Sequence, residues 1–539
     1  MTATDTTETP RWEILGKAAR ERREKQLPEE YRIPKDKMPD DSVKDVSNFP
    51  RESGLFTEQE LEITECTVPA LLKAIEDKKW TAVDVAKAYF KRAAYAHQLT
   101  NCLSEMFFER GLEQAKQLDE YYEKEGKLKG PLHGIPISMK DNQMIKGTLA
   151  SIGFCYWTEE IAQENSSLVQ LLVSLGAVMY CKTSVPSAMM SADTDTRVFG
   201  TTTNPKNRTL TVGGSSGGEG ALSAFGGSPV GLGSDIGGSI RIPANYNGIY
   251  GLKGTSGRIP ALGSKMGLGG QLHIKSVNGP MSRYLESVEY IAKVIFNSNP
   301  ELVDHAMVPL PWREPTVPKK LVFAVLKSDN NVRPTPAVTR ALEKTVKALE
   351  DQGHQVIEWE PIEHGKMSQI VTGMFTQDGC LGIRAALKDE PLLEYKQGNE
   401  HLLKDFPSSF VWGMQRARAE VENAVFAQWN NTGIDGLIAP VTPVPSHPHK
   451  TNIYHGYTSY WNAMDYPAVA FPVLRADATI DGKPEYTPLS DDDKAVWSVY
   501  DQEKYDTGCV GLQIITRRYQ DETALKLAGV ISEALQHAN

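Results

Sequence analysis

The sequence contains no apolar run of the ~18 residues that a membrane helix requires. Its first residues, Met1 to Thr6, are polar and lack the apolar stretch of a secretory signal. Basic residues are not in excess, because 58 Lys and Arg stand against 68 Asp and Glu, which gives a net charge of −10 at pH 7. Nucleic acids and anionic membranes favour basic surfaces. We therefore expect a soluble, cytoplasmic protein with no membrane span and no nucleic-acid partner.

Cysteine and nucleotide-binding patterns are equally sparse. The six cysteines are scattered without a C-x-x-C pair, so the sequence predicts no metal site, and a disulfide framework is not expected in so long a chain. No G-x-x-x-x-G-K-[ST] pattern occurs. Gly231-Leu232-Gly233 begins like a dinucleotide-binding fingerprint, but Ile236 stands where the third glycine belongs. Nucleotide binding is therefore disfavoured.

The chain divides by composition into two parts. Residues 1–65 are charged and interrupted by proline, and we interpret them as an arm, with a helix from Trp12 to Lys25, that wraps a catalytic domain of residues 66–539. In that domain helical and strand patterns alternate, with a capping box at Thr81 and Asp84. Helices are expected at 109–123, 167–175, 336–351 and 410–429, and strands at 135–139, 178–181, 321–326, 355–359 and 436–440. Such alternation predicts an α/β sandwich with a largely parallel sheet.

Two glycine- and serine-rich segments follow each other closely in the middle of the chain. Gly213-Gly214-Ser215-Ser216-Gly217-Gly218 precedes Asp235-Ile236-Gly237-Gly238-Ser239, and a lysine, Lys140, ends the apolar run that starts at Gly134. Glycine allows the backbone to bend tightly and to approach a ligand. A serine needs a base and N–H donors before it can act as a nucleophile. The pattern predicts a hydrolytic site of two serines and one lysine.

A lysine acts as a base only when it is neutral, and its ordinary pKa is about 10.4. Burial can lower that pKa, although a shift to about 7 costs on the order of 4–5 kcal/mol. Serine hydroxyls are suitable partners for Lys140 because they add no negative charge. Asp141 would raise the pKa of the lysine, but neighbouring strand residues point to opposite faces, so we expect Asp141 to bond nearby backbone.

Ser239 is the predicted nucleophile. The successive N–H groups of Ile236, Gly237, Gly238 and Ser239 can converge on a developing oxyanion. Ser215 would relay a proton between Ser239 and Lys140. Ser216 would either support the lysine or cap the helix that begins near Glu219.

A competing interpretation uses the same residues differently. Gly213 to Gly217 also fit G-x-S-x-G, the nucleophile elbow of α/β-hydrolases, in which Ser215 would attack with the help of a histidine. The candidate histidines are His354, His364, His447, His449 and His455, and none lies in a distinctive loop. This interpretation leaves Lys140 and the segment from Asp235 to Ser239 without a role.

The three segments together resemble the amidase signature family. The family's lysine motif is present as Gly134 to Asp141, and its serine- and glycine-rich signature runs from Gly213 to Ala221 and from Gly233 to Pro243. Shorter matches, including Ala439-Pro440-Val441-Thr442-Pro443 and Asp465-Tyr466-Pro467-Ala468-Val469, extend the resemblance over nearly the whole chain. The arm looks like that of fungal acetamidases within the family, and fatty acid amide hydrolase is a more distant likeness. Gly254 departs from the family's usual proline.

The resemblance implies one α/β/α domain around a mixed, twisted sheet of about eleven strands, with no metal or cofactor. It implies a Ser-cisSer-Lys triad in which Lys140 is the base, Ser215 the relaying serine and Ser239 the acylated nucleophile. Further implied roles are an oxyanion hole from the backbone of Ile236, Gly237, Gly238 and Ser239, substrate binding by Met189, Ser215 and Ile236, and support of the site by Ser216, Asp235 and Arg241.

We therefore expect an amidase that converts small aliphatic or aromatic amides into carboxylates and ammonia or amine through an acyl-enzyme. A fatty-amide or other long-chain hydrolase, a glutamine-hydrolysing amidotransferase subunit and an inactive binding relative are the alternatives. The sequence leaves open whether the protein is a homodimer.

Overall fold

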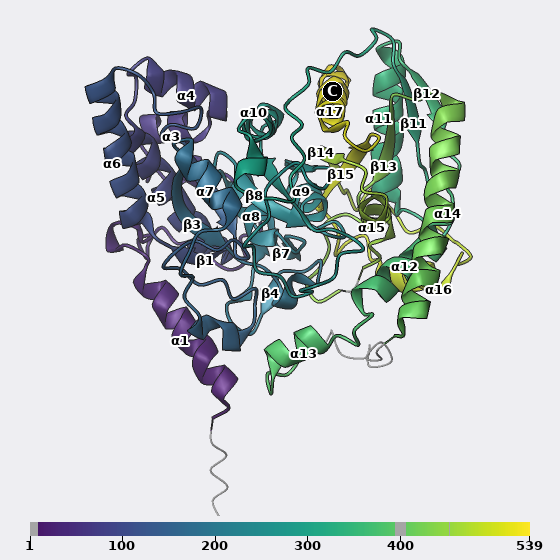
Figure 1. Ribbon diagram of the computed structural model, residues 1–539, viewed down its shortest axis with the longest axis horizontal. Helices are drawn as coiled ribbons and strands as arrows, with labels where there is room; N and C mark the ends of the chain where they lie inside the picture. The colour runs from purple at the N-terminus through teal and green to yellow at the C-terminus, as the bar shows by residue number, and fades with distance from the viewer. Residues whose placement is uncertain (1–8, 394–405, 452, 539) are drawn as a thin grey trace, which may run out of the picture.

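An eleven-stranded mixed sheet runs through the molecule, and the computed structural model describes residues 9–393, 406–451 and 453–538 (Figure 1). In spatial order the strands are β1 (Leu103–Met106), β3 (Val178–Thr183), β2 (Pro136–Lys140), β8 (Gly231–Asp235), β10 (Val277–Ser282), β9 (Tyr250–Lys253), β14 (Ala468–Arg475), β15 (Cys509–Ile515), β13 (Gly436–Pro440), β11 (Val322–Val325) and β12 (Gln355–Glu358). Two small separate pairs are β4 (Asp195–Thr196) with β5 (Gly200–Thr201), and β6 (Thr203–Asn204) with β7 (Asn207–Thr211).

The direction of the strands corrects one expectation and confirms another. Within the described residues, only four of the ten strand pairs in the large sheet are parallel, namely β2 with β3 and β8, and β11 with β12 and β13. The prediction of a largely parallel sheet is therefore wrong, while the mixed sheet of about eleven strands is confirmed. β9 and β10 show the reason, because they follow each other without a helix between them and pair antiparallel.

Helices cover both faces of the sheet, and the alternation of side chains along β14 shows how. Val469 and Phe471 belong to one core cluster, with α10 (Leu285–Phe296), α11 (Pro336–Asp351) and α17 (Asp521–His537). Ala468 and Ala470 belong to a second cluster on the opposite face. That face carries α9 (Arg241–Asn247), α12 (His364–Phe375) and α15 (Gly456–Ala463), and α8 (Gly217–Phe225) contacts α9. The α/β fold is thus a layered sandwich with the predicted strand β13 and helix α11 in place.

The amino-terminal half adds a third core cluster. It joins α5 (Ala82–Thr100), α6 (Phe108–Glu125) and α8 to residues of the predicted arm, such as Phe49. The predicted capping box of Thr81 and Asp84 forms at the start of α5 and is confirmed. The remaining helices are α1 (Arg11–Lys25), α2 (Phe49–Glu52), α3 (Glu58–Thr64), α4 (Val68–Glu76), α7 (Ser167–Ser174), α13 (Leu381–Leu387), α14 (Ser408–Thr432) and α16 (Asp491–Val499).

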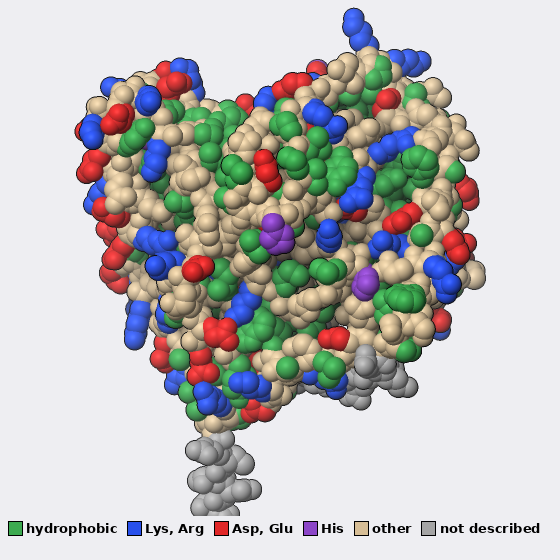
Figure 2. Space-filling view, viewed as in Figure 1, with side chains coloured by type: hydrophobic (Ala, Val, Ile, Leu, Met, Phe, Trp, Pro, Cys, Tyr) green, Lys and Arg blue, Asp and Glu red, His purple; other side chains and the backbone are tan. Residues whose placement is uncertain are grey.

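The predicted arm lies along the body in the part that the structure describes. Arg22 of α1 forms an ion pair with the buried Glu105 of β1 at 2.7 Å. Residues 1–8, with which the arm begins, lie outside the described residues, and the boundary at residue 65 stays a prediction. Among the described helices, none combines the length and the apolar composition needed to cross a membrane. On the face shown in Figure 2, basic and acidic side chains are interspersed.

The close approach of α8 to β3 yields a first prediction. A Cβ at Gly218 would lie 2.4 Å from the backbone nitrogen of Ser184 and 2.5 Å from the carbonyl oxygen of Cys102. Gly218→Ala should therefore lower the free energy of unfolding by roughly 3 kcal/mol or prevent folding, since backbone cannot yield as a side chain can.

Gly413→Ala in α14 is the matched control, because a Cβ there meets no atom within 4 Å and alanine favours a helix by about 1 kcal/mol. Denaturant unfolding of both variants measures the difference. Equal free energies of unfolding for the two variants would show that the close approach of Gly218 to Ser184 and Cys102 does not contribute to stability.

Candidate active site

Lys140 lies at the end of β2 with its side chain buried beneath α8. Ile137 and Met139 point into the core cluster on the other face, so Lys140 takes the opposite side of the strand. Its Nζ donates to Ser215 Oγ at 2.8 Å, to Ser234 Oγ at 2.8 Å and to the Ser234 carbonyl at 3.3 Å. The structure thus brings Lys140 and Ser215 together as predicted, and adds Ser234.

Burial lowers the pKa of Lys140 to about 7. The carboxylates of Asp235, Glu219 and Asp141 oppose this shift, but the loss of hydration is the larger effect. The neutral amine at position 140 is therefore far more populated near pH 7 than that of an exposed lysine.

Asp141 turns away from Lys140, as the alternation along the strand predicts. Its carboxylate accepts hydrogen bonds from the Ser104 hydroxyl at 2.8 Å and from the backbone N–H of Ile152 at 2.7 Å. Lys182 lies 3.8 Å from it. The negative charge of Asp141 is therefore engaged by groups other than Lys140.

Glu219 is a second buried carboxyl group close to the lysine. It lies one helical turn after Ser215 in α8 and accepts hydrogen bonds from the hydroxyls of Ser138 at 2.6 Å and Thr183 at 2.9 Å. Burial raises the pKa of Glu219 to about 7, although these hydroxyls and Lys140 favour its charged form. Glu219 and Lys140 are thus two interacting groups that change charge in the same pH range.

Ser215 is held at the start of α8 by an unusual backbone. The peptide bond between Gly214 and Ser215 is cis. A Cβ at Gly214 would lie 2.2 Å from the carbonyl oxygen of Ser191, so only glycine fits there.

Ser216 occupies the N-cap position of α8, yet its side chain does not cap the helix. Its hydroxyl donates to the Ser234 carbonyl at 3.2 Å and accepts from the Ser234 N–H at 3.2 Å. Of the two predicted roles, capping is therefore wrong. Ser216 instead contacts Ser234, the residue that bonds Lys140.

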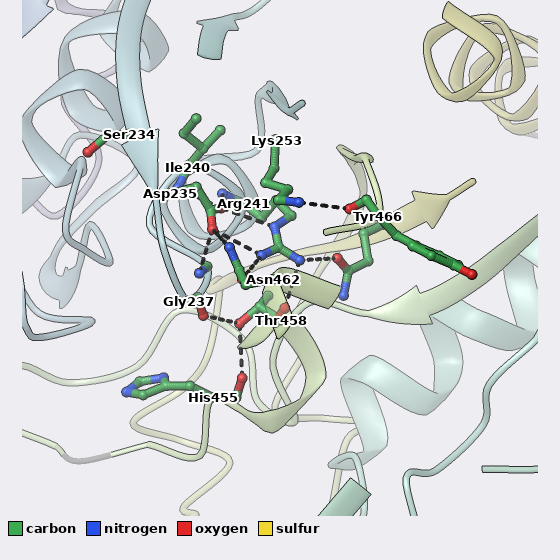
Figure 3. Close-up of polar contacts among 12 residues, drawn as sticks. Ser234, Asp235, Gly237, Ile240, Arg241, Lys253, His455, Thr458, Asn462 and Tyr466 are labelled. Carbon is green, nitrogen blue, oxygen red and sulfur yellow. Dashed lines mark hydrogen bonds and ion pairs between the residues drawn. The ribbon is translucent and has the colours of Figure 1, made fainter. Parts of the chain in front are cut away.

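A buried ion pair fixes the loop that carries Ser239 (Figure 3). Asp235 accepts two hydrogen bonds from the Arg241 guanidinium, both at 3.0 Å, and one from the Asn462 amide at 2.9 Å. Burial alone would raise the pKa of Asp235, but Arg241 and Asn462 hold that pKa below its usual range. Arg241 also donates to the Thr458 carbonyl at 3.1 Å and to Gln513 Oε1 at 2.9 Å.

The backbone amides of this loop are not all available to a ligand. The Gly238 N–H donates to Asp235 Oδ1 at 2.8 Å, which corrects the expectation that it is free for an oxyanion. The N–H groups of Ile236, Gly237 and Ser239 have no backbone partner within the described part of the chain. Thr458 donates to the Gly237 carbonyl at 2.7 Å, so this carbonyl is held by α15 (Figure 3).

Two cavities meet at Ser239. The larger has a volume of about 180 Å³, and its walls include Ile242, Val371, Phe375 and His455. The smaller has a volume of about 30 Å³ and is lined by both Ser215 and Ser234. Met189, Ile236 and Ser239 line both cavities. Ser239 therefore shares a cavity with Ser215, although no hydrogen bond joins their hydroxyls.

The histidines do not form the triad of the competing interpretation. Among the described residues, no histidine ring donates to or accepts from Ser215 or Ser239, whereas Lys140 bonds Ser215 directly. His455 lines the larger cavity, and burial lowers its pKa to about 4, so its ring is neutral at pH 7. The described residues also contain no group of three or more His, Cys, Asp or Glu side chains placed to bind a metal ion.

Comparison with known proteins shows the family of this chain. The Amidase family model matches residues 84–525. The chain belongs to the amidase signature family. A putative amidase of Schizosaccharomyces pombe is 38% identical over 510 residues, which are 93% of this chain and 95% of that protein. The acetamidase of Aspergillus oryzae is 36% identical over 544 residues, or 98% and 99% of the two chains.

A solved structure gives the same result for the fold. A fatty acid amide hydrolase superposes with a TM-score of 0.93 at 32% identity and covers 98% of this chain and 95% of its own. A bacterial aryl acylamidase, at 19% identity and a TM-score of 0.71, shares the fold.

Several residues of this amidase signature site escaped the sequence analysis. Ser234 stands directly before the second glycine-rich segment, so its position in the sequence could have indicated a role in the site. Thr458 and Asn462 lie more than 200 residues beyond that segment, at positions that carry no local motif, and Gln513 lies still further along the chain. Only the tertiary structure brings them to Arg241.

The pKa of Lys140 predicts how stability depends on pH. In the unfolded chain the lysine loses its proton near pH 10.4, whereas in the folded chain it does so at about 7. Between these values the unfolded state holds one more proton, so raising the pH favours folding. Relative to Lys140→Met, the free energy of unfolding of the parent should be flat below pH 7 and rise by about 1.4 kcal/mol per pH unit above it.

Urea unfolding of both proteins in a Glu219→Gln background from pH 6 to pH 9 measures this difference. The background substitution removes the coupled titration of Glu219, and the titrations of groups that do not interact with Lys140 cancel. The solvent-exposed Lys25→Met is the control, and its difference from the parent should stay constant. A constant difference for Lys140→Met as well would show that Lys140 keeps an ordinary pKa in the folded state.

Proposed function

We propose that this protein hydrolyses carboxylic acid amides, with Ser239 as nucleophile, Ser215 as proton relay and Lys140 as base. One observation carries the proposal: a buried amine with a pKa of about 7 lies 2.8 Å from a serine hydroxyl that shares a cavity with Ser239. The names of the relatives, amidases and acetamidases, are consistent with an amide hydrolase.

In the proposed acylation step, Ser239 Oγ attacks the amide carbonyl carbon. The proton of Ser239 passes to Ser215, whose own proton passes to the neutral amine of Lys140. The carbonyl oxygen becomes an oxyanion, which the free N–H groups of Ile236, Gly237 and Ser239 stabilise. The C–N bond then breaks, and the leaving nitrogen takes a proton from Ser215, which Lys140 reprotonates. An ester of Ser239 and free ammonia or amine result.

Deacylation repeats the same proton path with water. The water gives its proton through Ser215 to Lys140 as its oxygen attacks the ester carbonyl. Ser239 Oγ leaves and regains a proton by the reverse route. The products are a carboxylic acid, which releases the second proton of the water to solvent and becomes a carboxylate, and the original enzyme.

The larger cavity supports a small acyl group. Its volume of about 180 Å³ is close to the roughly 150 Å³ that holds a benzene ring in an engineered protein cavity. Val371 and Phe375 give it apolar walls. A short aliphatic chain or one aromatic ring therefore fits, with Met189 and Ile236 beside the reacting carbonyl.

A long-chain amide hydrolase is the second candidate, favoured by the superposition on a fatty acid amide hydrolase with a TM-score of 0.93. Parallel assays of acetamide, benzamide and a long-chain fatty amide decide between the two. Ammonia release from these amides by the isolated chain would also exclude a glutamine-hydrolysing subunit that needs a partner and an inactive binding relative.

The nucleophile is tested by removal of one oxygen atom. Ser239→Ala should abolish amide hydrolysis and labelling by a fluorophosphonate probe, because no other group on the loop can form the acyl-enzyme. Its unfolding curve should match the parent's, since the Ser239 hydroxyl makes no hydrogen bond to another described residue. Rates are measured by ammonia release. Retained hydrolysis in the purified variant would dismiss Ser239 as the nucleophile.

The base is tested by the pH dependence of kcat/KM. In the parent this rate should rise with pH through about 7 as Lys140 loses its proton. Lys140→Ala should lower the rate by roughly 10²–10⁴-fold and remove that rising limb. Lys25→Met is the control, because this lysine is exposed and lies outside the site, and it should keep the limb at the same pH. A limb that survives in Lys140→Ala would assign the base to another residue.

A further inference from the structure

The two cavities that meet at Ser239 differ in the chemistry of their walls. Ser215 and Ser234 line only the smaller cavity, whereas Val371 and Phe375 line only the larger one. A substrate carbonyl at Ser239 must therefore point one substituent toward each cavity. The position of Ser215 decides which substituent goes where.

Proton transfer fixes the leaving nitrogen near Ser215. In the proposed reaction this nitrogen takes a proton from Ser215 Oγ, so the two atoms must come within about 3 Å. Ser215 Oγ is itself oriented by Lys140 at 2.8 Å. The leaving group must then occupy the smaller cavity, and the acyl group the larger.

The smaller cavity has room for little more than the nitrogen itself. Its volume is about 30 Å³, one sixth of the larger cavity's 180 Å³, and a single water molecule needs at least about 10–15 Å³ in the same measure. Met266 and Leu268 form part of its wall, with Gly267 between them. A Cβ at Gly267 would lie 2.9 Å from the Ala188 carbonyl oxygen, so this segment already lies against the opposite wall.

We propose that Met266 and Leu268 are specificity-determining residues that restrict the leaving group to ammonia. The substrates are accordingly primary amides of short aliphatic or aromatic acids, and N-alkyl amides and anilides are excluded. This inference rests on the proposed function, because it uses Ser215 as the proton donor to the leaving nitrogen. It defines the leaving group of the substrate, whereas the larger cavity defines the acyl group.

The test compares benzamide with N-methylbenzamide, which differ only in the leaving group. Leu268→Ala and Met266→Ala should each raise the ratio of kcat/KM for N-methylbenzamide over benzamide by about tenfold relative to the parent, the effect that one added methyl group has in a confined pocket. Both side chains are half-buried, so the variants should fold. The double variant should raise the ratio further.

Val371→Ala is the matched control, because it removes a similar volume from the larger cavity. It should leave the ratio of kcat/KM for N-methylbenzamide over benzamide unchanged. It should instead raise the ratio of kcat/KM for 4-ethylbenzamide over benzamide. An unchanged leaving-group ratio in the double variant, or a parent that cleaves both amides equally well, would overturn the inference.

Benzamide hydrolysis by the same proteins separates this inference from the proposed function. If Ser239→Ala still hydrolyses benzamide, the proposed function fails and the inference fails with it. If the parent hydrolyses benzamide through Ser239 but the ratios do not move, only the assignment of Met266 and Leu268 fails.

Discussion

The site depends on a single costly arrangement, an amine at Lys140 that is removed from water. A buried ammonium group would attract a carboxylate, and a carboxylate in contact with it would keep it charged. The structure instead surrounds the amine with hydroxyls of Ser215 and Ser234. The nearby carboxylates are engaged elsewhere, Asp235 by Arg241 and Glu219 by two hydroxyls. The amine of Lys140 can therefore lose its proton near neutral pH, because a hydroxyl group can hydrogen-bond both the charged and the neutral amine.

This arrangement also explains why so many glycines surround the site. The partners of Lys140 are Ser215, two residues before α8 begins, and Ser234 of β8, so both elements must lie very close to β2. A Cβ at Gly231 of β8 would fall 1.8 Å from Glu219 Oε2 of α8 and 2.6 Å from Ser138 Oγ of β2. The glycine-rich segments are therefore a packing requirement as much as a means of presenting backbone amides to a ligand.

Local and tertiary features differ in how far the sequence reveals them. Helix α11 and strand β13 have the bounds that their apolar patterns predict. The contact between Lys140 and Ser215 could also be predicted, because each residue lies in a short, recognisable motif. The direction of the sheet strands was mispredicted, because an alternating pattern does not show that β9 and β10 pair without a crossover. The hydrogen bond from the Gly238 N–H to Asp235 was not predicted for a similar reason, because it depends on side-chain geometry rather than on residue type.

The nucleophile loop shows why the whole chain is needed for one site. Asp235 and Arg241 come from the middle of the sequence, but the guanidinium is completed by Thr458 and Asn462 of α15 and by Gln513 of β15. Without these acceptors Arg241 would keep its ion pair with Asp235 but lose three hydrogen bonds, and each buried donor left without an acceptor costs about 1–3 kcal/mol. The Arg241 guanidinium thus links the nucleophile loop to α15 and β15. The geometry of Ser239 is therefore a property of the complete eleven-stranded sheet, and not of the glycine-rich segment alone.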